Sequence, residues 1–244
     1  MSGHSKWHNI QRTKGTQDAK RAKIFTKIAR EIIVAVKDGG GSDPSNNSRL
    51  GAAVAKAKAA NMPNDNIKRT IEKAVGSGAG DSYESVTYEG YGPCGVAVIV
   101  EAMTDNRNRT ASEMRHHFDK YGGNMGTSGC VSWSFQRRGV IIIDNEDGGL
   151  DEDTVIIDAL EAGAEDVESG DGVFEIYTAP DGITSVNDIL ETAGYVFLSA
   201  QVEMIPQNNV KLTDPDDIKN MEKMLELMED NDDVSDVWHN YEHD

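Results

Sequence analysis

The densest cluster of functional side chains in the sequence is basic and lies at the N-terminal end. Residues 3–30 contain eight lysines and arginines, a single acidic residue, Asp18, and a tryptophan, Trp7. Lysine and arginine neutralise the phosphates of nucleic acids, and an indole ring stacks on unpaired bases. These residue types together point to nucleic acid as the ligand of this segment.

From Gln17 onward, the spacing of the residues predicts a helix with two unlike faces. At 100° per residue, Phe25, Ile28, Ile32 and Val36 fall on one side of this helix. Five cations fall together on roughly the opposite side: Lys20, Lys23, Lys27, Arg30 and Lys37. We therefore expect one face to pack against neighbouring helices and the other to stay positive and exposed to solvent.

Residues 2–16 have no apolar period and are predicted to form an arm that precedes this helix. Within the arm, Lys6, Arg12 and Lys14 are expected to contact phosphates, and Trp7 is expected to stack on a base. The alternative is that Trp7 packs on its own domain, because a lone tryptophan near a terminus often does so.

A second basic motif is TDNRNRT at residues 104–110, where a predicted strand is followed by a predicted helix. Asp105 or one of the two asparagines can cap this helix. Arg107 and Arg109 would then lie at the positive end of the helix dipole, which favours a phosphate. The alternative is that these arginines pair with nearby carboxylates.

Other motifs give little support for catalysis, a metal or a cofactor. GYGPCG at residues 90–95 matches a glycine-rich nucleotide-binding pattern, but a strand is predicted after it, which favours a tight turn. His4 and His8, and likewise His239 and His243, are four positions apart, but both pairs lie in segments predicted to be non-helical. The two cysteines have no such partner, so no metal site is expected. Acidic runs such as EDNDD at residues 229–233 are interpreted as solvated helix ends. We therefore expect a non-enzymatic protein without a cofactor, a metal or a small-molecule substrate.

Charge is distributed unevenly along the 244 residues, whose formal net charge is -18. Residues 1–75 contain 15 lysines and arginines and 6 acidic residues, whereas residues 76–244 contain 9 and 36. This asymmetry is typical of a basic nucleic-acid module joined to an acidic remainder with another role. No membrane-spanning run or signal-peptide pattern is recognised, and two cysteines suit a reducing compartment, so a cytoplasmic location is expected.

The elements that must position the basic residues are predicted to be helices. Helical patterns cover residues 17–38, 47–61 and 64–75, and a linker rich in glycine follows them. Three short helices can form a bundle, so residues 1–78 are predicted to be a basic helical domain.

The rest of the chain alternates between strands and helices. From residue 140 to residue 204, the predicted order is β-α-β-β-α-β, the ferredoxin-like order, which defines an acidic domain at 136–206. The segments on either side, 79–135 and 207–244, are expected to share one discontinuous α/β domain. Separate strands are expected on the two sides of residues 137–139. The predicted fold class is α+β, with the ferredoxin-like domain inserted into the other α/β domain.

Several motifs together resemble the YebC/PmpR family. They follow one another along nearly the whole chain: GHSKW, QDAKR, KIFTKIAREI, NMPNDNIKR, YEGYGP, TDNRNRT, GGNMG and EAGAEDV. The resemblance implies a helical N-terminal domain and two α/β domains around a concave, largely acidic surface, in a cytoplasmic protein without a cofactor. It also implies either a transcriptional regulator that binds promoter DNA or a factor that acts on the ribosome.

The positions that match these motifs are expected to contact nucleic acid: Lys6, Trp7, Lys20, Arg21, Lys23, Lys27, Arg30, Arg107 and Arg109. The chain departs from the family pattern at Gln11 and Thr13, which make the arm less basic. It also departs at Cys94, where many members have glycine, which argues against a backbone conformation that only glycine adopts.

We therefore expect a regulator of gene expression that binds promoter DNA through its basic N-terminal domain. One alternative is a ribosome-associated factor that binds ribosomal RNA, and another is an acidic scaffold for protein interactions. No helix with base-reading residues at its start is recognised in the sequence, and an acidic body repels long duplex DNA, which favours RNA. The resemblance to the family, whose bacterial members are described as transcriptional regulators, favours a role in transcription.

Overall fold

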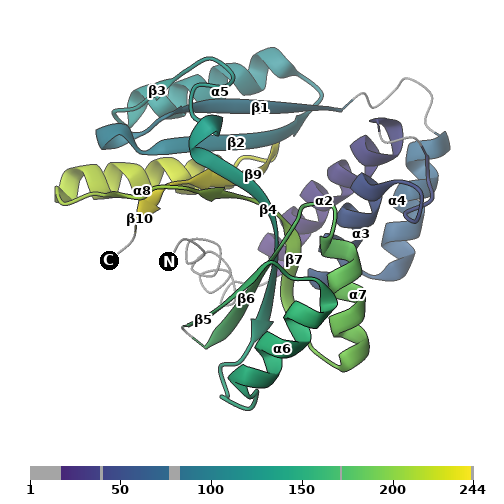
Figure 1. Cartoon of the computed structure of the whole chain (residues 1–244). Helices are drawn as coiled ribbons and strands as arrows, with labels where there is room; N and C mark the ends of the chain where they lie inside the picture. The colour runs from purple at the N-terminus through teal and green to yellow at the C-terminus, as the bar shows by residue number, and fades with distance from the viewer. Residues whose placement is uncertain (1–17, 39–40, 77–82, 171, 243–244) are drawn as a thin grey trace.

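The N-terminal helices form a small bundle. The computed structural model describes four stretches of the chain: 18–38, 41–76, 83–170 and 172–242. In the first two stretches, α2 (Asp18–Asp38), α3 (Ser48–Ala59) and α4 (Asn64–Gly76) pack together (Figure 1). The predicted apolar stripe of α2 is buried in this core, where Ile32 and Leu50 are fully covered. The side chain of Asn47 caps α3.

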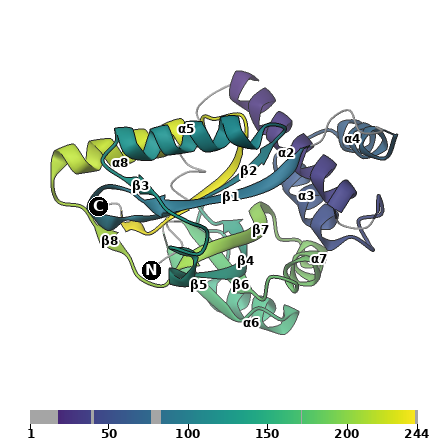
Figure 2. The ribbon, with the colours of Figure 1, turned by 90° about the horizontal axis from the view of Figure 1, so that it is seen from above.

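The first sheet joins strands from distant parts of the chain, in the antiparallel order β3-β1-β2-β9. Its members are β1 (Glu84–Tyr91), β2 (Ala97–Thr104), β3 (Asn124–Met125) and β9 (Val234–His239). Two helices, α5 (Arg107–Lys120) and α8 (Pro215–Glu229), cover one face of this sheet (Figure 2). Beside it, β8 (Val210–Lys211) pairs in parallel with β10 (Tyr241–Glu242).

The second sheet has the order β5-β6-β4-β7, and every neighbouring pair in it is antiparallel. Its elements follow the ferredoxin-like order: β4 (Phe135–Asp144), α6 (Glu152–Ala162), β5 (Asp166–Gly170), β6 (Val173–Thr178), α7 (Ile183–Ala193) and β7 (Phe197–Pro206). Alternate residues of β4 face opposite sides, so Ile141 and Ile143 pack under α6 and α7. The fold is therefore α+β, with this unit between the parts of the first sheet.

The prediction of two strands around residues 137–139 is wrong. A short 3-10 turn at Ser132–Ser134 leads directly into the continuous strand β4. Gly139 pairs with Thr178 on one side and with Val202 on the other. A Cβ at this position would collide with the Thr178 side chain and lie 2.9 Å from the Cβ of Ile183. Glycine is thus explained here by close packing inside a strand and not by a turn.

The turn between β1 and β2 places Cys94 in the left-handed region. GYGPCG forms a 3-10 turn at Pro93–Gly95 and β2 follows, which confirms the predicted turn. Cys94 has φ 53° and ψ 23°, a conformation that favours glycine. The position is therefore not restricted to glycine, as expected, but the cysteine costs about 1 kcal/mol of backbone strain there.

Gly90 in β1 is expected to tolerate no side chain. A Cβ there would lie 2.6 Å from the carbonyl oxygen of Asn124 and 2.9 Å from the Phe118 ring. Gly90→Ala should therefore lower the free energy of unfolding by about 2 kcal/mol, measured by urea denaturation. Gly76→Ala is the control, because a Cβ there meets nothing within 4 Å. Equal effects of the two changes would contradict this account.

The bundle and both sheets meet around one cleft. α2 contacts β2 and β9, α3 contacts β7, and β7 contacts β9. The cleft has a volume of about 580 Å³, and Arg49, Lys56, Glu101, Arg137 and Asp236 are among the residues that line it. In the described part of the chain, no helix combines the length and apolar character needed to cross a membrane.

Candidate nucleic-acid interface

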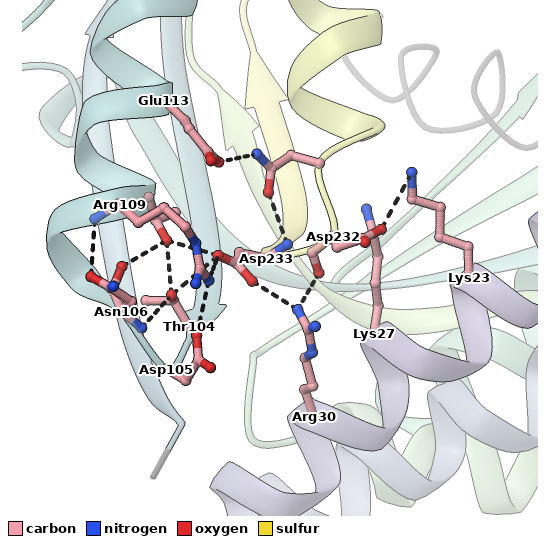
Figure 3. Close-up of polar contacts among 12 residues, drawn as sticks. Lys23, Lys27, Arg30, Thr104, Asp105, Asn106, Arg109, Glu113, Asp232 and Asp233 are labelled. Atoms are coloured by element: carbon pink, nitrogen blue, oxygen red, sulfur yellow. Dashed lines mark hydrogen bonds and ion pairs between the residues drawn. The ribbon is translucent and has the colours of Figure 1, made fainter. Parts of the chain in front are cut away.

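Two lysines on the cationic face of α2 contact the acidic loop, which we define as the last residue of α8 and the turn that leads to β9, residues 229–233 (Figure 3). The Nζ of Lys23 lies 2.8 Å from Oδ1 of Asp230 and also donates to the carbonyl oxygen of Asp230. Lys27 donates to the carbonyl oxygen of Glu229 over 2.6 Å. Both ammonium groups are thus held by acceptors of the same acidic loop.

Arg30 continues this contact one turn further along α2. Its Nη1 donates to the carbonyl oxygen of Asp232 over 2.6 Å and to Oδ1 of Asp233 over 2.9 Å. Its guanidinium also lies over the ring of Tyr83, 5.1 Å from the ring centre. Arg30 therefore joins the bundle to the first sheet.

These contacts correct two expectations. The face of α2 that carries Lys23, Lys27 and Arg30 does not stay exposed to solvent, because the acidic loop at residues 229–233 lies against it. That loop is also more than a solvated helix end, since its carboxylates and carbonyls accept hydrogen bonds from α2. Any contact of these three cations with nucleic acid would have to displace the loop.

The environment changes the pKa values of the two lysines in opposite directions. Burial, together with the positive charge of Lys23, lowers the pKa of Lys27 to about 8. Burial also opposes the charge of Lys23, but the hydrogen bond and charge of Asp230, with Asp232 nearby, raise the pKa of Lys23 overall. The α2 face therefore offers less free positive charge than its sequence indicates.

Asp233 connects three parts of the molecule through one buried carboxylate. Its Oδ2 accepts from Nη2 of Arg109 at 2.6 Å, from Oγ1 of Thr110 at 2.9 Å and from Oγ1 of Thr104 at 3.2 Å. Its Oδ1 accepts from Arg30. Burial opposes the charge on Asp233, but these donors outweigh it and lower the pKa of the carboxyl.

The motif at residues 104–110 divides its two arginines between different roles. Asn106 caps α5, since its side chain accepts from the backbone N–H of Arg109 at 3.1 Å. Arg109 pairs with Asp105 at 2.9 Å as well as with Asp233, so the expected alternative of pairing with carboxylates holds for it. Arg107 is exposed, and its guanidinium forms no ion pair with another residue of the described stretches.

Lys56 is the centre of a second cluster, at the wall of the cleft. Its Nζ lies 2.9 Å from Oε1 of Glu31 and 2.7 Å from Oδ2 of Asp236. Burial raises the pKa of Glu31 despite the charge of Lys56, and burial with the charge of Asp236 raises that of Glu101. Among the described residues, no group of three or more His, Cys, Asp and Glu could hold a metal ion.

Other described cations of the bundle are exposed, and four of them are Arg21, Lys58, Lys68 and Arg69. Arg21 donates to the carbonyl oxygen of Asn61 over 3.3 Å, which ties the start of α2 to the turn between α3 and α4. Lys58, Lys68 and Arg69 form no ion pair with other residues that the structure describes. We call these four residues the α3–α4 cationic surface.

The same surface contains the start of α4, the helix that the sequence predicts over residues 64–75. A turn at residues 60–63, with Asn61 at φ 57°, joins α3 to α4 in the connectivity of a helix-turn-helix. The first two turns of α4 expose Asn64 and Asn66, which precede Lys68 and Arg69. Asparagine and arginine side chains can form hydrogen bonds with base edges, so the start of α4 carries residue types that the sequence interpretation did not recognise as base-reading.

Five predicted contact residues cannot be placed in this interface. Lys6, Trp7, Arg12 and Lys14 lie outside the described residues. Lys20 belongs to α2, but its side chain also lies outside the described part. Their contacts with nucleic acid stay predictions.

The partners of the α2 cations are the residues that sequence reasoning missed. The signal was present, because EDNDD at residues 229–233 carries the charge opposite to that of the lysine stripe on α2. The two segments are about 200 positions apart, since Lys27 and Glu229 differ by 202. No local pattern indicates that such distant segments are neighbours.

Comparisons with known proteins cover nearly the entire chain. Residues 5–77 match the model of the TACO1/YebC protein N-terminal domain, and residues 83–241 match that of the TACO1/YebC second and third domain. A probable transcriptional regulatory protein of Ruminiclostridium cellulolyticum is 57% identical over 244 residues, covering 100% of this chain and 98% of that protein. A protein of the same description from Geobacillus kaustophilus is 53% identical over 240 residues, covering 98% and 97% of the two chains.

A solved structure agrees with the fold. The crystal structure of a conserved hypothetical protein from Aquifex aeolicus has a TM-score of 0.82 and 46% sequence identity, and the match covers 92% of this chain and 91% of that one. Both family models, taken with these relatives, span the bundle and the two sheets. The chain therefore belongs to the TACO1/YebC family.

Proposed function

We propose that this protein is a non-enzymatic, cytoplasmic regulator of gene expression that binds promoter DNA through its N-terminal module. The observation that carries the proposal is the α3–α4 cationic surface, which stays exposed while most of the α2 face is paired. The printed names of the relatives, probable transcriptional regulatory proteins, support the same role.

In this proposal, the α3–α4 cationic surface and the arm bind the phosphates. Lysine and arginine release the counterions condensed on the nucleic acid, which drives binding without regard to sequence. Arm residues Lys6, Arg12 and Lys14 extend the phosphate contacts, Trp7 stacks on an exposed base, and Lys20 and Arg107 are additional contacts. Lys23, Lys27, Arg30 and Arg109 are not assigned to the contact set, because intramolecular partners hold them.

In this proposal, Asn64 and Asn66 at the start of α4 contact base edges and give the binding its sequence preference. Asparagine can form two hydrogen bonds with an adenine edge in the major groove, and N-terminal residues of recognition helices make such contacts. Both side chains are exposed and lie next to Lys68 and Arg69. Phosphate-binding residues beside base-reading residues favour a duplex DNA target.

The acidic remainder of the chain favours a second candidate, a ribosome-associated factor that binds ribosomal RNA. Residues 76–244 contain 36 acidic and 9 basic residues, and this charge repels a long duplex that extends past the bundle. A short or irregular RNA segment can contact the bundle without approaching the acidic sheets. Crosslinking in cells, followed by sequencing of the attached nucleic acid, distinguishes the two: promoter DNA supports the first candidate and ribosomal RNA the second.

Charge reversal tests the cationic surface directly. The double change Lys68→Glu and Arg69→Glu is expected to weaken binding to a promoter fragment at least about tenfold, measured by fluorescence anisotropy. It should also reduce the slope of log affinity against log salt by about 2, one for each lost phosphate contact. Both side chains are exposed, so circular dichroism should show an unchanged fold.

The matched control is Lys219→Glu with Lys223→Glu, which makes the same change of charge on α8. This control should leave affinity and salt dependence nearly unchanged. If the two double variants lose affinity equally, the effect is one of total charge, and the assignment of the α3–α4 cationic surface fails.

A further inference from the structure

The ferredoxin-like unit contains no positive charge over most of its length. Residues 139–210 include 17 aspartates and glutamates and no lysine, arginine or histidine. Both of its helices, α6 and α7, lie within this segment. Nothing inside the segment offsets the negative charge, so the potential at its surface attracts cationic groups.

The outer face of α6 combines this charge with exposed aliphatic side chains. Ile157 is 55% exposed and Leu160 is 50% exposed, although both are large and apolar. They lie three positions apart, on the side of α6 opposite the residues that pack on the sheet: Val155, Ala159 and Ala162. The exposed acids Asp153 and Glu161 lie on the same outer face, four positions before and after Ile157.

We call Asp153, Ile157, Leu160 and Glu161 the α6 surface. On many helices, lysine or arginine stems cover exposed aliphatic residues, but residues 139–210 provide none. Ile189 on the neighbouring helix α7 is also 48% exposed, and the two helices contact each other. In Figure 1, α6 lies over one face of its sheet and farther from α4 than α7 does.

We infer that the α6 surface docks a basic amphipathic helix of another protein. Apolar residues of such a helix, spaced three and four apart, cover Ile157 and Leu160, and its lysines or arginines reach Asp153 and Glu161. Because residues 139–210 are acidic throughout, they attract a cationic helix and repel an acidic one. This partner site is separate from the α3–α4 cationic surface, so one chain can hold a nucleic acid and a basic protein together.

The test uses the full chain and a synthetic helical peptide with leucines on one face and lysines flanking them. Titration followed by NMR should shift amide signals of residues 153–161, and the double variant Ile157→Ser, Leu160→Ser should bind the peptide about tenfold more weakly or worse. Val75→Ser is the matched control, because Val75 is 63% exposed but belongs to α4, and it should bind as the unchanged chain does. Asp153→Asn with Glu161→Gln, which leaves the apolar contact intact, should also weaken binding and reduce its salt dependence.

Several results would overturn the inference. A peptide with glutamates in place of the lysines should not bind, so equally tight binding of that peptide contradicts the inference. Unchanged binding by both double variants contradicts it as well. Self-association in sedimentation experiments that disappears with Ile157→Ser, Leu160→Ser would assign the surface to a second copy of this chain instead. Binding that is observed only after deletion of residues 1–16 would assign it to the chain's own arm.

Discussion

Lys56→Met is expected to lower the free energy of unfolding by about 3 kcal/mol at neutral pH. The change removes the ammonium group that lies 2.9 Å from Glu31 and 2.7 Å from Asp236. Methionine keeps the length of the side chain, so packing changes little. Two carboxylates that are only 12% and 13% exposed then face each other without a cation, and this is the main cost.

The pH dependence of this effect follows from the raised pKa values of Glu31 and Glu101. A group whose pKa is higher in the folded state contributes stability that is present at low pH and is lost as pH rises through the folded pKa. Without Lys56, the pKa of Glu31 rises further. The variant should therefore approach the unchanged chain in stability as the pH is lowered from 7 towards the range in which these carboxyls are protonated.

Urea denaturation at several pH values measures both parts of this prediction. Lys58→Met is the control, because Lys58 is on the same helix but exposed, and its replacement should cost less than about 0.5 kcal/mol. A loss for Lys56→Met that is independent of pH would indicate altered packing and not unpaired carboxylates.

Asp233→Ala is expected to have a comparable effect, again a loss of about 3 kcal/mol. The side chain of Asp233 is 7% exposed, and its carboxylate accepts from two arginines and two threonines. Removing it leaves Arg30 without its carboxylate and the buried hydroxyls of Thr104 and Thr110 without this acceptor. The contact between α2 and the first sheet should weaken at the same time.

The stability that Asp233 contributes depends on pH in the direction opposite to that of the Lys56 cluster. The pKa of Asp233 is lowered in the folded state, so its contribution is present above the unfolded pKa and is lost as pH falls through the folded pKa. Asp233→Ala should thus lose less stability than the unchanged chain when the solution is acidified. Asp232→Ala is the control in the same loop, since its side chain is 71% exposed and its ion pair with Lys23 is worth less than about 1 kcal/mol. Equal losses for the two changes would show that the loop acts through its backbone alone.

Local patterns in the sequence are enough to predict most of the elements. The apolar stripe of α2, the cap at Asn106 and the β-α-β-β-α-β order each depend on residues a few positions apart, and the structure contains all three. The continuous strand β4 was not predictable in this way. An arginine pair before glycine is typical of a turn. Here, however, glycine is required because a Cβ would collide with Thr178 and Ile183, which lie about 40 positions later in the chain.

The candidate site was less predictable than the fold. The lysine stripe on α2 can be recognised from its spacing, but whether Lys23 and Lys27 face solvent depends on a loop about 200 residues later. Lys58, Lys68 and Arg69 follow no periodic spacing that would mark them in the sequence. They become candidates because the acidic loop covers a different face of the bundle, and this is a property of tertiary structure.

The pairing of α2 with residues 229–233 also has a consequence for the order in which the protein is made. The ribosome synthesises α2 early and this loop, together with β9, among the last elements of the chain. Until then, Lys23, Lys27 and Arg30 have none of the acceptors described above, and the edge of β2 lacks the strand that covers it. A nascent chain thus presents a more basic helix and an open sheet edge, and both are covered only when synthesis is nearly complete.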